Sequence, residues 1–151
     1  MMDPLILFKL AEFHFALKLD HVERVVHSVE ITPLPGAPRV IEGVFDLAGE
    51  IIPVINMRRR FGMADKRIAL TDRIIIARPG RRVGLLVDEV GEIVPKCDFV
   101  PAAGISSGLV YLEGAMYREE NVVVITCLER FLSAEESVDL EESLGECHAD
   151  S

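Results

Sequence analysis

The stretch ITPLPGAPRVIEGVFDLAGEIIPVINMRRRFG, residues 31–62, decides the fold of this chain. Three prolines in residues 33–38 remove backbone donors and fix φ, so that segment is a loop. VFDLAG and EIIPVIN predict two strands joined by a turn at Gly49-Glu50, and Pro53 predicts an edge strand or a bulge. MRRRFG predicts a short helix near Met57 to Phe61. Nothing in the stretch looks catalytic, so it points to a protein that binds other proteins.

The flanking segments predict further hairpins. LILFKL (residues 5–10) and FHFALKL (residues 13–19) alternate between apolar and polar positions, with a short link between them. Two more hairpins are expected around Pro79-Gly80 and around Glu119-Glu120-Asn121, and a helix near Leu128 to Leu132. About ten short strands with turns every eight to twelve residues indicate barrels or a sandwich. We therefore expect a mainly β protein.

Length and composition bound the class of protein. The chain has 151 residues, half of them hydrophobic, and a mean hydropathy of +0.29. No apolar run approaches the roughly 20 residues that a membrane helix needs, and the N-terminus lacks the basic region of a signal peptide. The sequence predicts a cytoplasmic protein without direct membrane insertion. Residues 135–151 are expected to be an acidic helix end followed by a disordered tail.

Charge and cysteine content exclude several functions. The net charge of −9 argues against nucleic-acid binding, which needs a basic face. The arginines at 58–60 and at 78, 81 and 82 are expected to be solvated surface. The three cysteines form no CxxC pair, so they predict ordinary thiols. The sequence thus predicts no metal and no cofactor.

Two features resemble catalytic or metal sites but lack the required context. Residues 104–108, GISSG, match the GxSxG pattern around Ser106, but that pattern needs a preceding strand and a following helix. The histidines His14, His21 and His27 lack the spacing of a metal site. We expect a flexible loop around Ser106 and solvent-facing histidines, and hence no enzyme.

Several motifs occur in the order and at the spacing of the CheW family. They are Ile31 to Pro38, Ile41-Glu42-Gly43-Val44, Leu47 with Gly49, Ile52-Pro53-Val54-Ile55 with Arg58, and Gly84 to Val90. Leu128 to Leu132 resembles the final helix of that family. The chain is therefore similar to CheW proteins over roughly Leu5 to Leu132.

The resemblance implies two interlocking five-stranded SH3-like β-barrels with short helices. It makes residues 1–134 a CheW-like domain of two barrel lobes, and the polar segment 63–71 is the expected lobe boundary. It implies a non-catalytic adaptor that couples the helical tips of chemoreceptors to a CheA-type histidine kinase, in arrays at the membrane. The alternatives are a stand-alone CheW-like domain of a specialised pathway or array competitor and, more weakly, a hydrolase built on Ser106.

Partner contact is expected at strand edges and in a groove between the lobes, because small barrels leave little internal room. Roughly half of the apolar candidates are expected to be core. The candidates are Val22, Val25, Val44, Leu47, Ile74, Val87, Ile93 and, in the Gly/Ser loop, Ile105.

Two positions depart from the family pattern. The family usually reads N-L-R-G where this chain has Asp46-Leu47-Ala48-Gly49, and it usually carries a glutamate at the place of Arg24. Both changes alter a charge that the family links to its signalling surface. Arg24 and Ala48 are therefore expected to tune the choice of partner.

Overall fold

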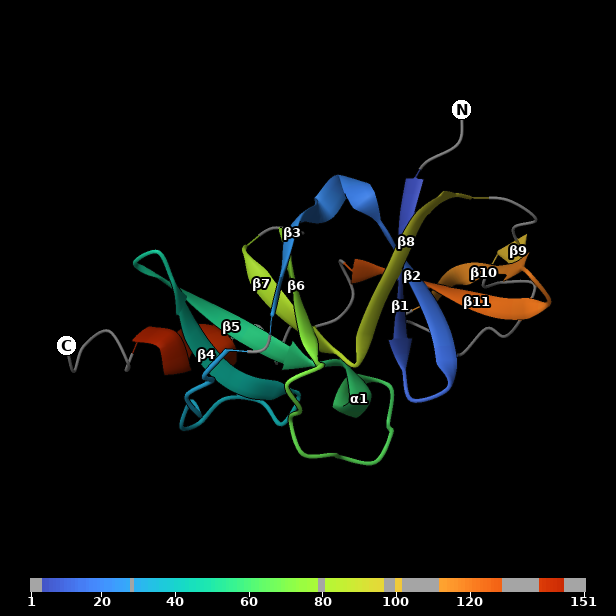
Figure 1. Cartoon of the computed structure of the whole chain (residues 1–151). Coiled ribbons are helices and arrows are strands. Elements are labelled where there is room, and N and C mark those ends of the chain that lie inside the picture. Colours follow the sequence, from blue (N-terminus) through green and yellow to red (C-terminus); the bar gives the residue numbers. More distant parts are fainter. Residues whose placement is uncertain are drawn as a thin grey trace.

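The computed structural model describes residues 4–27, 29–78, 81–96, 100–101, 112–128 and 139–145. Its strands form two sheets, which we call lobe A and lobe B (Figure 1). The strands of lobe A are β1 (Pro4–Leu10), β2 (Phe13–Lys18), β8 (Glu89–Pro95), β9 (Val100–Pro101), β10 (Leu112–Arg118) and β11 (Asn121–Thr126). Those of lobe B are β3 (Val22–His27), β4 (Ile41–Leu47), β5 (Glu50–Asn56), β6 (Arg73–Ala77) and β7 (Val83–Val87). The mainly β, two-sheet prediction is confirmed, although lobe A has six strands rather than five.

The two lobes are interlocked by the path of the chain. It starts in lobe A, crosses through the short helix η1 (Leu19–His21), completes lobe B, and returns to lobe A with β8. Lobe A is then joined across its middle, where β11 pairs in parallel with β2. The strand order is β8-β1-β2-β11-β10-β9 in lobe A and β3-β6-β7-β5-β4 in lobe B.

The predicted lobe boundary near residues 63–71 is wrong. This segment lies between the helix α1 (Met57–Arg60) and β6, and the strands on both sides of it belong to lobe B. The buried carboxylate of Asp72 accepts hydrogen bonds from Lys66 Nζ at 2.7 Å and from the Ala69 amide at 2.8 Å. A polar composition suggested a linker, but these bonds fold the segment against its own lobe.

The β4–β5 hairpin shows how the deciding stretch builds lobe B. Its turn residues are Ala48, with φ of 50°, and Gly49, with φ of 93°, one position before the predicted turn. The edge-strand prediction from Pro53 is wrong, because β5 lies between β4 and β7. Pro53 is opposite Val44 in the β4–β5 pair. The N–H and C=O of Val44 both bond to Thr32, at 2.8 Å, on the other side of β4. Val44 therefore needs no backbone hydrogen bond from Pro53, and the missing N–H of the proline is tolerated there.

Glycine is required at position 43 because Thr32 lies against β4. Its φ is 156°, and a Cβ there would lie 2.2 Å from the Thr32 carbonyl oxygen. Backbone atoms cannot move aside as a flexible side chain would, so only glycine lets the 31–32 segment cover the edge of β4.

Three apolar clusters form the core. One fills lobe A around Leu5, Met116 and Ile125, and another fills lobe B around Phe45, Ile52 and Ile74. The third and largest lies between them and includes Phe8 of β1 and Leu85 of β7.

The helix predicted near Met57 to Phe61 is confirmed as α1, with the Asn56 side chain capping the Arg59 amide. Of the helix predicted near Leu128 to Leu132, only Leu128 lies within the described residues. In the acidic segment 135–151, residues 139–145 are helical and pack on the body of the protein through two buried leucines. Packed structure therefore extends into the segment that was expected to end in a disordered tail.

Candidate partner-binding surfaces

An ion pair joins the two lobes. Arg58 in α1 donates to Asp88, with 3.0 Å between Nε and Oδ1, and a second bond joins its Nη2 to Oδ2. Asp88 follows β7 directly, and its Oδ2 also accepts the amide of Ala11 in the β1–β2 turn at 2.7 Å. Both side chains are about four fifths buried. The pair thus ties lobe B, the crossover into β8 and the first hairpin of lobe A into one unit.

The pKa values of this pair follow from its surroundings. Burial raises the pKa of Asp88, but the hydrogen bonds from Arg58 and from the Ala11 amide outweigh it, so the net direction is downward. The hydrogen bond to Asp88 raises the pKa of Arg58 in turn. The pair is therefore ionised at neutral pH, which suits a structural joint better than proton transfer.

The prediction that the 58–60 arginines are solvated surface is wrong for two of them. Besides Arg58, the half-buried Arg59 pairs with Glu42 at 3.0 Å and with Asp65 at 2.9 Å. Arg58 and Asp88 belong to separate family motifs in the sequence, and the fold makes them partners.

A charged network marks one end of lobe B. Arg82, just before β7, pairs with Glu23 of β3 at 3.1 Å and also with Glu50 at the start of β5. Arg78 reaches the same Glu23 at 3.4 Å. Arg78 and Arg82, which the sequence predicts to be solvated surface, are thus ordered in a network across three strands.

The two altered family positions lie on this same end. Arg24 follows Glu23 on the edge strand β3, and Ala48 lies in the β4–β5 turn, two positions before Glu50. Both residues are exposed, as is Val25, while Leu47 and Val22 are half-buried. We call Arg24, Val25, Leu47 and Ala48 the lobe B end.

Lobe A exposes an apolar row that the sequence did not indicate. Tyr117 and Val122 are opposite one another on β10 and β11, and they are 60% and 52% exposed. Phe13, 61% exposed, lies beside Val122, because the neighbouring pair is His14 with Val123. We call Phe13, Tyr117 and Val122 the lobe A row. No local pattern predicts it, since the parallel pairing brings together residues more than 100 positions apart.

The remaining predicted contact residues divide by burial. Ile93 is 58% exposed on the edge strand β8, as a contact residue should be. Val44, Ile74 and Val87 are buried, so their assignment as partner contacts is wrong. Ile105 lies outside the described residues. Three of the seven predicted residues other than Ile105 are thus core, close to the expected half.

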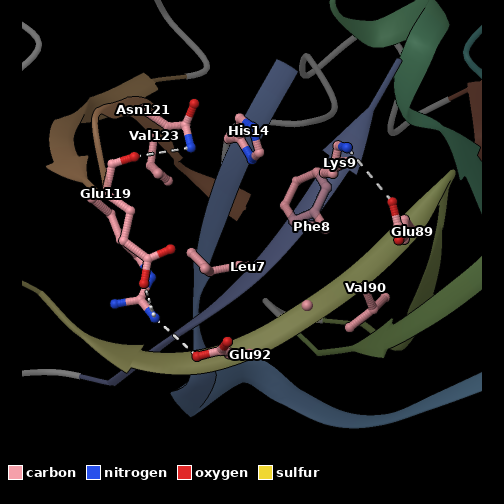
Figure 2. Close-up of a pocket in the computed structure, with 12 residues that line it drawn as sticks. Leu7, Phe8, Lys9, His14, Glu89, Val90, Glu92, Glu119, Asn121 and Val123 are labelled. Carbon is pink, nitrogen blue, oxygen red and sulfur yellow. Dashed lines mark hydrogen bonds and ion pairs between the residues drawn. The ribbon is translucent and has the colours of Figure 1, made fainter. Parts of the chain in front are cut away.

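A cavity of about 200 Å³ in lobe A is lined by residues of β1, β2, β8 and the β10–β11 hairpin. Figure 2 shows His14 and Leu7 on its wall and the pair of Lys9 with Glu89, 3.8 Å apart, on its rim. Arg118, which also lines the cavity, pairs with Glu92 at 2.9 Å. Because both cations are already paired, the rim has no free positive group that would select an anionic ligand.

The described residues offer no metal centre. No group of three or more His, Cys, Asp or Glu side chains among them could hold a metal ion. His21 lies in η1 and His27 at the end of β3, apart from His14 in β2. Ser106 lies outside the described residues. Among the residues that the structure describes, no helix is long and apolar enough to cross a membrane.

Comparison with known proteins decides the family. The family model described as a CheW-like domain matches residues 4–136. The chain belongs to the CheW family. The probable chemotaxis protein CheW of Rhizobium etli is 30% identical over 138 residues, covering 88% of this chain and 89% of that protein.

Other CheW relatives agree with this assignment. The chemotaxis protein CheW of Treponema pallidum is 23% identical over 87% of this chain and 83% of its own. The crystal structure of the scaffolding protein TtCheW from Thermoanaerobacter tengcongensis superposes with a TM-score of 0.81 at 31% identity, covering 90% of this chain and 96% of that one. The CheW fold of two interlocked lobes is therefore the fold of this chain.

Proposed function

We propose that this CheW-family protein is a non-catalytic adaptor that couples chemoreceptors to a CheA-type histidine kinase in a chemosensory array. The observation that carries the proposal is the presence of two chemically different exposed surfaces on one rigidly joined body. The lobe A row is apolar, the lobe B end lies beside the charged Arg82 network, and the Arg58–Asp88 pair joins the two lobes. A protein that joins two partners needs such a pair of surfaces and a firm connection.

The chemistry of each surface suggests its partner. Phe13, Tyr117 and Val122 offer a contiguous apolar strip, which suits the apolar face of a helical receptor tip. The lobe B end combines an exposed strand edge with fixed charges, which suits a β domain of the kinase that presents a complementary edge. Ile93, on the exposed edge of lobe A, would extend the receptor contact.

A pull-down with the organism's own receptors and CheA homologues tests the proposal. Val122→Asp should lower receptor capture at least tenfold, because it places a charge in the apolar strip. Arg82→Glu should lower kinase capture, because it puts a third acid between Glu23 and Glu50. Leu70→Asp is the matched control, since Leu70 is 93% exposed but lies away from both surfaces.

The outcomes separate the parts of the proposal. If the native chain captures neither partner, the adaptor function is wrong. If both variants lose the same partner, the division between the lobes is wrong while the adaptor function stands.

Arg24 and Ala48 favour a second candidate, a CheW-like domain of a specialised pathway or a competitor that caps arrays. Both residues are exposed on the lobe B end, where they could change the choice of partner without disturbing the fold. A double-mutant cycle with Arg24→Glu and Ala48→Arg should show non-additive effects on kinase affinity. Strictly additive effects would mean that the two positions act independently.

The hydrolase alternative has its own test. Ser106 should be dispensable, because the sequence supplies no orienting base for it. A burst of product from an activated ester that disappears in Ser106→Ala would establish catalysis instead.

A further inference from the structure

The helix at residues 139–145 lies beyond the part of the chain that matches the CheW family. The match ends at residue 136, yet this helix packs on the family domain. Figure 1 shows it, in red, on the side of lobe B. Leu140 and Leu144 are only 1% and 5% exposed, and they join the large cluster that includes Leu34 and Val40.

The helix is amphipathic in a way that matches what it covers. Leu140, Ser143 and Leu144 form the buried stripe, at the i, i+3 and i+4 spacing of one helix face, while Asp139, Glu141 and Glu142 are exposed. Glu141 pairs with Arg81 of the body. Ser143 lies over Gly36, where an added Cβ would come within 3.3 Å of its hydroxyl oxygen. The covered area, Leu34, Gly36, Val40 and Arg81, is thus an apolar seat with one cation, and we call it the helix seat.

The attachment is separable from the fold of the domain. A segment as short as residues 139–145 does not persist as a helix alone in water, so docking holds these residues in shape. The Ser143 hydroxyl donates within the helix, to the Asp139 carbonyl at 2.9 Å, and so it does not anchor the helix to the body. The Glu141 side chain of the ion pair is largely exposed, which makes the pair weak. Two leucines therefore provide most of the attachment.

We infer that the helix seat binds acidic amphipathic helices, and that residues 139–145 occupy it as an intramolecular ligand. A partner helix that carries leucines at i and i+4 with an acid at i+1 would present the same groups to the seat and would compete for it. A partner helix would then have to bind the helix seat with enough affinity to displace residues 139–145. This inference goes beyond the adaptor function and does not depend on the identity of the receptor or kinase.

Fluorescence anisotropy of a labelled peptide of residues 135–146 tests the seat directly. In the full chain, Leu140→Asp with Leu144→Asp should release the resident helix and bind the peptide at least tenfold more tightly than the native chain does. Glu142→Gln is the matched control, because Glu142 is exposed on the same helix and its variant should bind as weakly as the native chain. A peptide carrying both Leu→Asp changes should not bind. In the released variant, Arg81→Glu should weaken peptide binding several-fold.

A released variant that stays folded but binds the peptide no better than the native chain would overturn the inference. If that variant does not fold, hydrogen exchange of the native chain decides. Amides at 143–145 that exchange much faster than those of β5 would support a separable helix. Equal protection would make the helix part of the cooperative core and would refute the seat. Because neither measurement uses a receptor or kinase, failure here leaves the adaptor proposal intact.

Discussion

Lobe A and lobe B have the same strand-rich design but differ in how many large apolar side chains they expose. Five of the eight large apolar side chains that are exposed among the described residues belong to lobe A strands: Phe13, Ile93, Val100, Tyr117 and Val122. Both lobes carry ion pairs, but lobe B adds the Arg82 network, which joins three of its strands. The difference shows that one small domain can offer an apolar and a charged surface at once, provided that a firm joint separates them.

The interiors differ as well. Lobe B is filled by large branched and aromatic side chains, including Phe45, Ile52 and Ile74, whereas the lobe A cluster is smaller and ends in the 200 Å³ cavity. We therefore expect tighter packing in lobe B than in lobe A.

The largest expected effect tests this difference in packing. Ile74→Ala should lower the free energy of unfolding by about 4 kcal/mol, because it leaves a void in a closed interior. Met116→Ala in lobe A should cost about 2–3 kcal/mol, since the open end lets neighbours relax. Urea unfolding of the two variants measures both values. The reverse order would show that lobe A is the more tightly packed lobe.

The joint between the lobes should be the next most sensitive point. Arg58→Ala should cost about 3 kcal/mol, because it leaves the largely buried Asp88 without its cation. Arg118→Ala removes a more exposed pair with Glu92 and should cost less than about 1 kcal/mol in the same urea experiment. Equal effects would mean that the joint contributes no more than a surface pair.

The same joint predicts a dependence on pH. The pKa of Asp88 is lowered on folding, so its contribution to stability is present above the ordinary value of 3.8 and is lost as the pH falls through the folded pKa. In unfolding experiments from pH 6 to pH 2, the native chain should exceed Asp88→Asn in stability at pH 6, and the gap should close toward pH 2. A gap that stays constant with pH would exclude an ionic contribution from Asp88.

The smallest effect concerns the lobe B end. Ala48 has a φ of 50°, a left-handed conformation that costs an alanine energy and a glycine almost none. Ala48→Gly should therefore stabilise the chain by about 0.5 kcal/mol in thermal or urea unfolding. Ala64→Gly, in an exposed loop without a positive φ, is the control and should give no gain.

Local patterns predicted the hairpins but not the surfaces. The alternation of 5–10 with 13–19 and the turn at Glu119-Glu120 gave β1–β2 and β10–β11 correctly, because neighbouring segments pair through short turns. The family motifs gave the two-lobed arrangement. Local patterns do not predict the lobe A row or the Arg58–Asp88 pair, since each depends on contacts between distant parts of the chain.

Burial was misjudged for a different reason. Ile74, Ile75 and Ile76 are all fully buried, because β6 faces the lobe B interior on one side and the cluster between the lobes on the other. Alternation distinguishes the two faces of a strand, but it does not reveal that a second lobe covers the outer face. Alternation therefore cannot distinguish Ile74, or Val87 on β7, from an exposed contact residue.

The route of the chain through the two lobes has a consequence for biosynthesis. All five strands of lobe B lie between residues 22 and 87, so a ribosome delivers them before any later strand of lobe A. The β1–β2 hairpin cannot pair with β11, its parallel neighbour, until the end of the chain has been synthesised. Its Phe8 and Phe15 can already pack on the newly formed lobe B. The nascent protein would thus mature from its middle outward, with the lobe A row completed last.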